Sequence, residues 1–195
     1  MADITLDKPH TALLIADFYA EQMSKLPHAV NRKCVEKTLA LRQAARAAGV
    51  LICYSATVFR PGYIEVNERN KTFSERKRTG GPAIADPLTV IHPQMQPAEG
   101  EPVVGKHRVN AMFGTDLAMI LGARNVDTLV LLGFATSGVV LSTTRYAADA
   151  DYRLFIVEDC CADADPAVHD FLCAKIFPRQ ADVVQSADVI KALVA

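Results

Sequence analysis

The stretch "TLVLLGFATSGVVLST" (residues 128–143) places a strand, a sharp turn and the start of a helix in direct succession. Its first half is a continuous apolar run of strand length, as expected for a strand that is buried on both faces. The small residues Gly133, Ala135 and Gly138 then predict a tight turn, and Ser137 is expected to cap a helix that runs to about Asp149. A strand that leads through a tight turn into a helix is typical of α/β folds with a parallel sheet.

The same alternation of strand and helix patterns extends in both directions from this stretch. Further strand-like runs lie at residues 11–18, 50–59, 102–106, 153–159 and 181–186. Helical spacing is found within residues 31–49, 114–126, 165–177 and 187–195, and Gly49 supplies a helix stop. The sequence therefore predicts one domain over residues 1–195, with a three-layer α/β/α fold and a mostly parallel sheet of about six strands.

Residues 60–101 interrupt this alternation. They contain five prolines and the polar run "ERNKTFSERKRTGG" (68–81). A long loop inside a compact domain is uncommon and is often functional. The segment is predicted to be a loop that acts as a lid over the site, or an excursion that serves as a subunit contact without chemistry.

Composition restricts the class of protein. Half of the 195 residues are hydrophobic, and the net charge of −1 argues against nucleic-acid binding and against a membrane-surface patch. No secretory signal or apolar span is evident, so a cytoplasmic location is expected. The five cysteines form no CxxC pair and read as free thiols. The five histidines lack ligand spacing, so neither a metal nor another cofactor is expected.

The candidate chemistry lies at the ends of the predicted strands. Asp17 ends the first strand, Lys106 ends the third, and the elbow at residues 136–140 follows the fourth. In open parallel sheets, ligands bind beyond the carboxyl ends of the strands. A buried carboxylate and ammonium are costly unless paired, so their meeting at this edge favours a functional site.

Four stretches resemble, in order, the isochorismatase-like (cysteine hydrolase) family: "TALLIADFYAEQM" (11–23), "PVVGKHRVNAMFGTDLAMIL" (102–121), residues 128–163 and "FPRQADVV" (177–184). The resemblance implies a three-layer α/β domain that forms homodimers or higher homo-oligomers. It also implies a site built from an Asp, a Lys and a nucleophilic Cys. Asp17 and Lys106 match the first two, whereas Val139 stands where the Cys is expected, and valine cannot form a covalent adduct.

The resemblance still implies a reaction that needs no thiol. True isochorismatases hydrolyse a vinyl ether, with the family Asp as proton donor and water as nucleophile. Asp17 is then the acid, and Lys106 is its electrostatic partner or the group that holds a substrate carboxylate. The alternatives are an inactive pseudoenzyme that binds a small molecule or serves as an oligomeric scaffold, and an amidase with Ser137 or Ser142 as nucleophile.

Further residues complete the predicted site for a small-molecule substrate. The elbow backbone is expected to bind an oxyanion or to position water, and the family implies a cis peptide at Phe134–Ala135. The candidate elbow residues are Ala135, Thr136, Gly138 and Val139. The candidate pocket residues, which follow Asp17, the second strand or Lys106, are Phe18, Tyr19, Arg60, Tyr63, Asn110, Met112 and Phe113.

Overall fold

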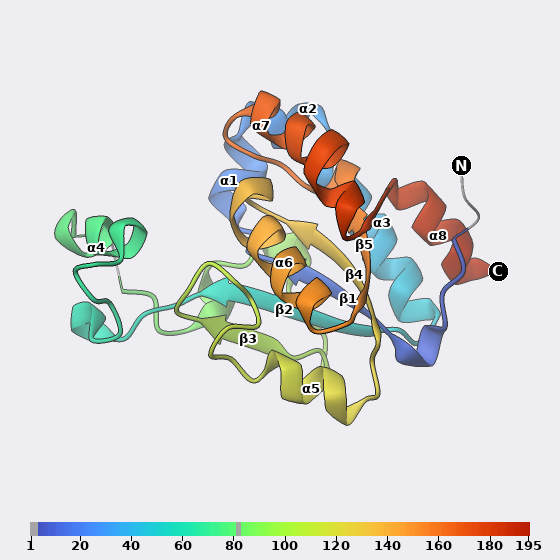
Figure 1. Cartoon of the computed structure of the whole chain (residues 1–195), viewed down its shortest axis with the longest axis horizontal. Coiled ribbons are helices and arrows are strands. Elements are labelled where there is room, and N and C mark those ends of the chain that lie inside the picture. Colours follow the sequence, from blue (N-terminus) through green and yellow to red (C-terminus); the bar gives the residue numbers. More distant parts are fainter. Residues whose placement is uncertain (1–3, 81–82) are drawn as a thin grey trace.

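The computed structural model describes residues 4–80 and 83–195. It is built on one six-stranded sheet, whose central strands are labelled in Figure 1. The strands are β1 (Thr11–Ala16), β2 (Leu51–Thr57), β3 (Val103–Lys106), β4 (Thr128–Gly133), β5 (Arg153–Val157) and β6 (Asp182–Val184). Their order is β3-β2-β1-β4-β5-β6, and every neighbouring pair is parallel. The predicted α/β fold and six-stranded sheet are confirmed.

The apolar runs form the middle of the sheet because helices cover both of its faces. Every residue of β1 and β4 is buried, so neither strand shows the alternation of a half-exposed strand. The two strands pair directly, with Ala16 opposite Gly133. The chain passes from β1 outward to β3 and then returns to β4, so the strand order reverses between β1 and β4. This reversal is the expected place for a ligand site.

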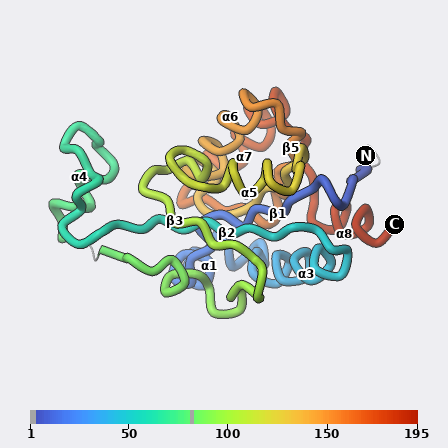
Figure 2. The backbone as a smooth tube through the Cα atoms, turned by 90° about the horizontal axis from the view of Figure 1, so that it is seen from below, coloured from blue at the N-terminus to red at the C-terminus, as the bar shows by residue number. Residues whose placement is uncertain are grey.

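The described part of the chain contains eight α-helices: α1 (Ala20–Lys25), α2 (Pro27–Asn31), α3 (Cys34–Ala47), α4 (Lys71–Arg78), α5 (Leu117–Ala123), α6 (Leu141–Asp149), α7 (Pro166–Phe171) and α8 (Ser186–Val194). Figure 2 shows α1 and α3 on one side of the sheet and α5, α6 and α7 on the other. Helix α8 packs against α3. Within residues 4–80 and 83–195, no helix has both the length and the apolar character needed to cross a membrane.

The turn after β4 differs from the expected simple helix start. Residues Thr136–Val140 form a π-helical turn that precedes α6, and Ser137 does not act as the helix cap. Instead, the backbone N–H of Ser137 donates to Oδ2 of Asp163 at 2.7 Å. The prediction failed here because the acceptor comes from the loop after β5, which no local pattern connects to Ser137.

The segment predicted as a loop at residues 60–101 contains helix α4. We call residues 60–80 the arm, and Figures 1 and 2 both show α4 standing apart from the other helices. Asn70 caps α4 by accepting from the N–H of Phe73 at 3.1 Å. Phe73 then packs with Phe59, Tyr63 and Val66 in a small second core. These contacts explain a helix in so polar a run; Gly81 and Pro82 lie outside the described residues.

Candidate active site

Asp17 and Lys106 meet at the carboxyl edge of the sheet. Asp17 directly follows β1 with a φ of +50°, and Lys106 is the last residue of β3. Strand β2 lies between them and ends at Thr57. The Lys106 side chain crosses the end of β2, so its Nζ lies 2.7 Å from Oδ2 of Asp17. The two side chains that were predicted to converge therefore form a buried ion pair.

The three N–H donors of the Lys106 ammonium are all engaged. Besides Asp17, Nζ donates to Oγ1 of Thr57 at 2.7 Å and to the carbonyl of Arg108 at 3.0 Å. An ammonium has three donors, and the Lys106 side chain is only 1% exposed. The structure thus leaves Lys106 no donor for a substrate carboxylate, and it acts instead to hold Asp17 and Thr57. Thr57 is a site residue that the sequence did not single out.

The Asp17 carboxyl group is divided between a held oxygen and a free one. Oδ2 contacts Lys106, whereas Oδ1 is buried and has no hydrogen-bond partner in the described structure. Burial raises the pKa of Asp17, while the charge of Lys106 and hydrogen bonds from neighbouring groups lower it; burial is the larger effect. A buried carboxylate oxygen without a partner is unfavourable, which agrees with the direction of this pKa shift.

The elbow after β4 is fixed by protein contacts. The peptide bond Phe134–Ala135 is cis, as the family resemblance implies. The N–H of Thr136 donates to the carbonyl of Ala162 at 2.9 Å, and that of Gly138 to the carbonyl of Ala135 at 3.0 Å. These two amides of the predicted elbow therefore donate within the protein. Val139 follows with 1% exposure.

A polar network that the sequence did not reveal lies behind the elbow. His169 is fully buried, with Nδ1 2.8 Å from Oγ1 of Thr136 and Nε2 3.3 Å from Oε1 of Glu158. Glu158 also pairs with Arg32 and accepts from Nε2 of Gln185 at 2.6 Å. The network ties the elbow to α2, to the end of β5 and to α7. Its members are far apart in the sequence, so no spacing could have indicated it.

This network predicts an acid-sensitive contribution to stability. The hydrogen bond with His169, together with Gln185 and Arg32, lowers the pKa of Glu158 to about 2. A lowered folded-state pKa stabilises the fold above the unfolded-state value, and this stability is lost as pH falls from about 5 to about 2. At about 1.4 kcal/mol per pKa unit, the contribution is on the order of 3 kcal/mol.

We therefore expect Glu158→Gln to flatten the acid limb of a stability–pH curve measured by urea unfolding. Glu68→Gln, which changes an exposed glutamate of the arm, serves as the control and should leave the curve unchanged. Equal acid sensitivity of wild type and Glu158→Gln would show that the network carries no such contribution.

A cavity of about 440 Å³ adjoins the Asp17–Lys106 pair. It is lined by Tyr19, Ala20, Glu21, Gln22, Thr57, Arg76, Ile84, Thr89 and Val90. Thr57 contacts both members of the ion pair, and the hydroxyl of Tyr19 accepts from the N–H of Thr57 at 2.7 Å. Tyr19 is thus the predicted pocket residue that lines this cavity.

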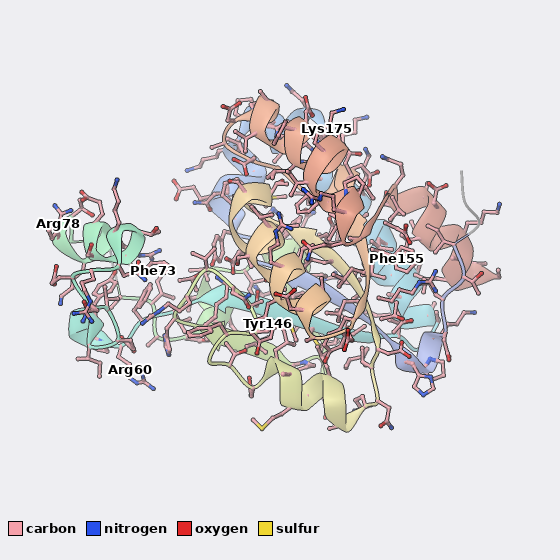
Figure 3. The ribbon with its side chains drawn as sticks, in the orientation of Figure 1. Arg60, Phe73, Arg78, Tyr146, Phe155 and Lys175 are labelled. Atoms are coloured by element: carbon pink, nitrogen blue, oxygen red, sulfur yellow. The ribbon has the colours of Figure 1, made fainter. Side chains whose placement is uncertain are left out.

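The other predicted pocket residues lie elsewhere. Phe18 is buried against His92, with ring centroids 6.2 Å apart, and Tyr63 belongs to the second core of the arm. Arg60 is exposed on the arm and pairs with Glu65 at 2.9 Å; Figure 3 shows it away from the ends of the strands. The loop after Lys106 contacts α6, because the side chain of Asn110 donates to the carbonyl of Ser142 at 2.7 Å. In the same loop, Met112 is buried and Phe113 is exposed.

Known proteins share the sequence pattern of this chain. The family model for the isochorismatase domain matches residues 11–188. The chain belongs to the isochorismatase family. It is 28% identical to maleamate amidohydrolase from Pseudomonas putida over 82% of this chain and 74% of that protein. It is also 28% identical to a probable isochorismatase from Pseudomonas chlororaphis over 97% of this chain and 89% of that protein.

A solved structure shows the same fold over nearly the whole chain. An isochorismatase family protein from Burkholderia thailandensis superposes with a TM-score of 0.80, is 27% identical and covers 98% of both chains. The relatives are hydrolases and isochorismatases, so this member of the isochorismatase family is a hydrolase of small molecules.

Proposed function

We propose that this isochorismatase-family hydrolase acts without a cysteine nucleophile, with Asp17 as a general acid and water as the attacking group. The observation that carries the proposal is the buried Oδ1 of Asp17, which has no partner in the described structure while Oδ2 is held by Lys106. Burial raises the pKa of this carboxyl group, and a general acid needs to be protonated at working pH. A vinyl ether is a substrate class whose hydrolysis begins with such a proton transfer.

In the proposed reaction, water adds across the vinyl double bond and the resulting hemiketal is then cleaved. The Asp17 proton moves to the terminal vinyl carbon, and the ether-bearing carbon becomes an oxocarbenium ion. Water adds to that carbon and returns one proton to the Asp17 carboxylate. The resulting hemiketal then breaks its bond to the leaving oxygen, which gives a ketone and an alcohol. Positive charge develops at the reacting carbon, so this chemistry does not depend on the elbow amides, of which those of Thr136 and Gly138 already donate within the protein.

The cysteines support a mechanism without a thiolate. Burial raises the pKa of each thiol: to about 11 for Cys34, to about 12 for Cys53, Cys160 and Cys173, and well above its ordinary value for Cys161. Protonated thiols are poor nucleophiles. At the position proposed to correspond to the family cysteine, Val139 offers no reactive atom.

Within residues 4–80 and 83–195, no histidine forms a hydrogen bond with the hydroxyl of Ser137 or Ser142, the two serines predicted as alternative nucleophiles. Oγ of Ser142 is buried without a hydrogen-bond partner in the described structure. His92 does contact Ser24 at 3.0 Å, but its Nδ1 accepts from the N–H of Gln94. Neutral His92 therefore carries its proton on Nε2 and donates it to Ser24, which is the wrong direction for a general base.

The test is the hydrolysis of small vinyl ethers, amides and esters by wild type and Asp17→Asn, with ketone, amine or alcohol release measured. We expect turnover of a vinyl ether that falls by at least about 100-fold in Asp17→Asn, since general acids contribute roughly that much. Wild-type turnover should also fall as pH rises through the raised pKa of Asp17. Asp182→Asn, an exposed change at the start of β6, should retain activity.

Each alternative predicts a different result. Unchanged turnover in Asp17→Asn contradicts the acid role. Binding without hydrolysis of any compound supports the pseudoenzyme, and an acyl adduct on Ser137 or Ser142 in mass spectra supports the serine amidase.

A further inference from the structure

We infer that Arg76 is the anion-binding residue of the cavity beside Asp17, and that the substrate carries a carboxylate that Arg76 holds. The inference rests on the proposed function for the identity of the reacting end of the cavity. It goes beyond that function by naming the second recognition group of the substrate and the residue that binds it.

The first step is that the arm supplies one wall of the cavity. Arg76 lies in α4, whereas Tyr19 and Thr57 lie beside the ion pair at the ends of β1 and β2. A ligand in the 440 Å³ cavity can therefore touch both the arm and the groups that hold Asp17. This volume suits a small organic acid rather than a macromolecule.

The second step is the state of the Arg76 guanidinium. It lies over the ring of Phe59, with 5.7 Å from Cζ to the ring centroid, and the side chain is half-buried. Its neighbours on α4 are matched with acids, Lys77 with Glu68 and Arg78 with Glu75. Among residues 4–80 and 83–195, no carboxylate pairs with Arg76. The ring fixes one face of the guanidinium and leaves its N–H edge available.

The third step excludes the other nearby charges. The three donors of Lys106 are used within the protein, so it cannot bind the substrate anion. The one carboxylate on the cavity wall, Glu21, is exposed and lies 3.6 Å from Lys25. A planar guanidinium can donate two parallel hydrogen bonds to a carboxylate, which makes Arg76 the natural partner for that group.

The probe for this site is benzoate, and benzamide is its uncharged counterpart. We expect benzoate, titrated into the wild type and followed by 1H–15N NMR, to perturb signals of cavity residues such as Tyr19 and Thr57. Its Kd should rise at least about tenfold in Arg76→Gln, because a charge-assisted contact is lost. Arg78→Gln, which removes the same charge from the same helix outside the cavity, should change the Kd by less than about twofold. Benzamide should bind weakly to all three proteins.

The inference is overturned if benzoate does not bind the wild type, if Arg76→Gln binds it as tightly, or if benzamide binds as well as benzoate. Urea unfolding of Arg76→Gln shows whether the arm remains folded, and Arg76→Lys, which keeps the charge but not the planar fork, should give an intermediate Kd. Asp17→Asn should bind benzoate at least as tightly as the wild type. If Arg76→Gln weakens benzoate binding while Asp17→Asn leaves turnover unchanged, the proposed function is refuted and the role of Arg76 is retained.

Discussion

Gly133→Ala is expected to prevent folding or to lower the free energy of unfolding by more than about 4 kcal/mol. A Cβ at this position would lie 1.8 Å from the carbonyl oxygen of Ala16 and 2.8 Å from its carbonyl carbon. The obstructing atoms are backbone atoms of β1, which is held between β2 and β4, so no side-chain rotation can relieve the clash. The φ of +144° at Gly133 is also a conformation that residues with a side chain rarely adopt.

The effect should appear in urea or thermal unfolding and in the yield of folded protein. Gly122→Ala is the matched control, because a Cβ at Gly122 in α5 would meet no atom within 4 Å. That change should be neutral or should stabilise the fold by up to about 1 kcal/mol through helix propensity. If Gly133→Ala unfolds like Gly122→Ala, the close approach of β1 and β4 at this point is not as described.

Lys106→Met is expected to remove activity and to destabilise the protein by roughly 3–5 kcal/mol, the usual cost of breaking a buried ion pair from one side. The substitution strips Oδ2 of Asp17 and Oγ1 of Thr57 of their shared donor, and it leaves the Arg108 carbonyl without its bond. Asp17 then remains in a buried site without a cation. Its pKa, already raised by burial, should rise further.

The pH dependence follows from that shift. A carboxyl group whose folded-state pKa lies above its unfolded-state value stabilises the fold below the unfolded-state value and loses that contribution as pH rises. Lys106→Met should therefore be less destabilised near pH 4 than near pH 8 in urea unfolding. Adding Asp17→Asn should recover part of the loss at pH 8, since the unpaired charge is gone. A double variant whose losses simply add would show that the two side chains are not coupled.

Local sequence was enough to predict the fold of this protein. The unbroken apolar runs of β1 and β4 indicate strands that are covered on both faces, and the intervening helical spacing indicates a parallel sheet. The family resemblance then identified Asp17 and Lys106 as site residues, whereas the strand order came from the structure. Both are strand-end residues, and strand ends of a parallel sheet share one edge.

The roles of several residues at the site could not be predicted from the sequence. Thr57 looks like any threonine that ends a strand, and only the crossing of β2 by the Lys106 side chain makes it part of the site. Arg60 precedes a turn and was predicted to be a pocket residue, but Glu65 already pairs with it. Arg76 lay within a polar run that predicted a loop, whereas α4 carries it to the cavity wall.

The sequence by itself determined which segments form strands, because the side-chain pattern is a local property. It also placed Asp17 and Lys106 at the ends of two of these strands. The tertiary structure alone decided the state of those groups. Whether Lys106 has a free donor, whether Asp17 keeps an oxygen without a partner, and which arginine faces the cavity all depend on atoms brought together from distant parts of the chain. Burial and pairing set a pKa and a binding role, and neither is a property of a residue in isolation.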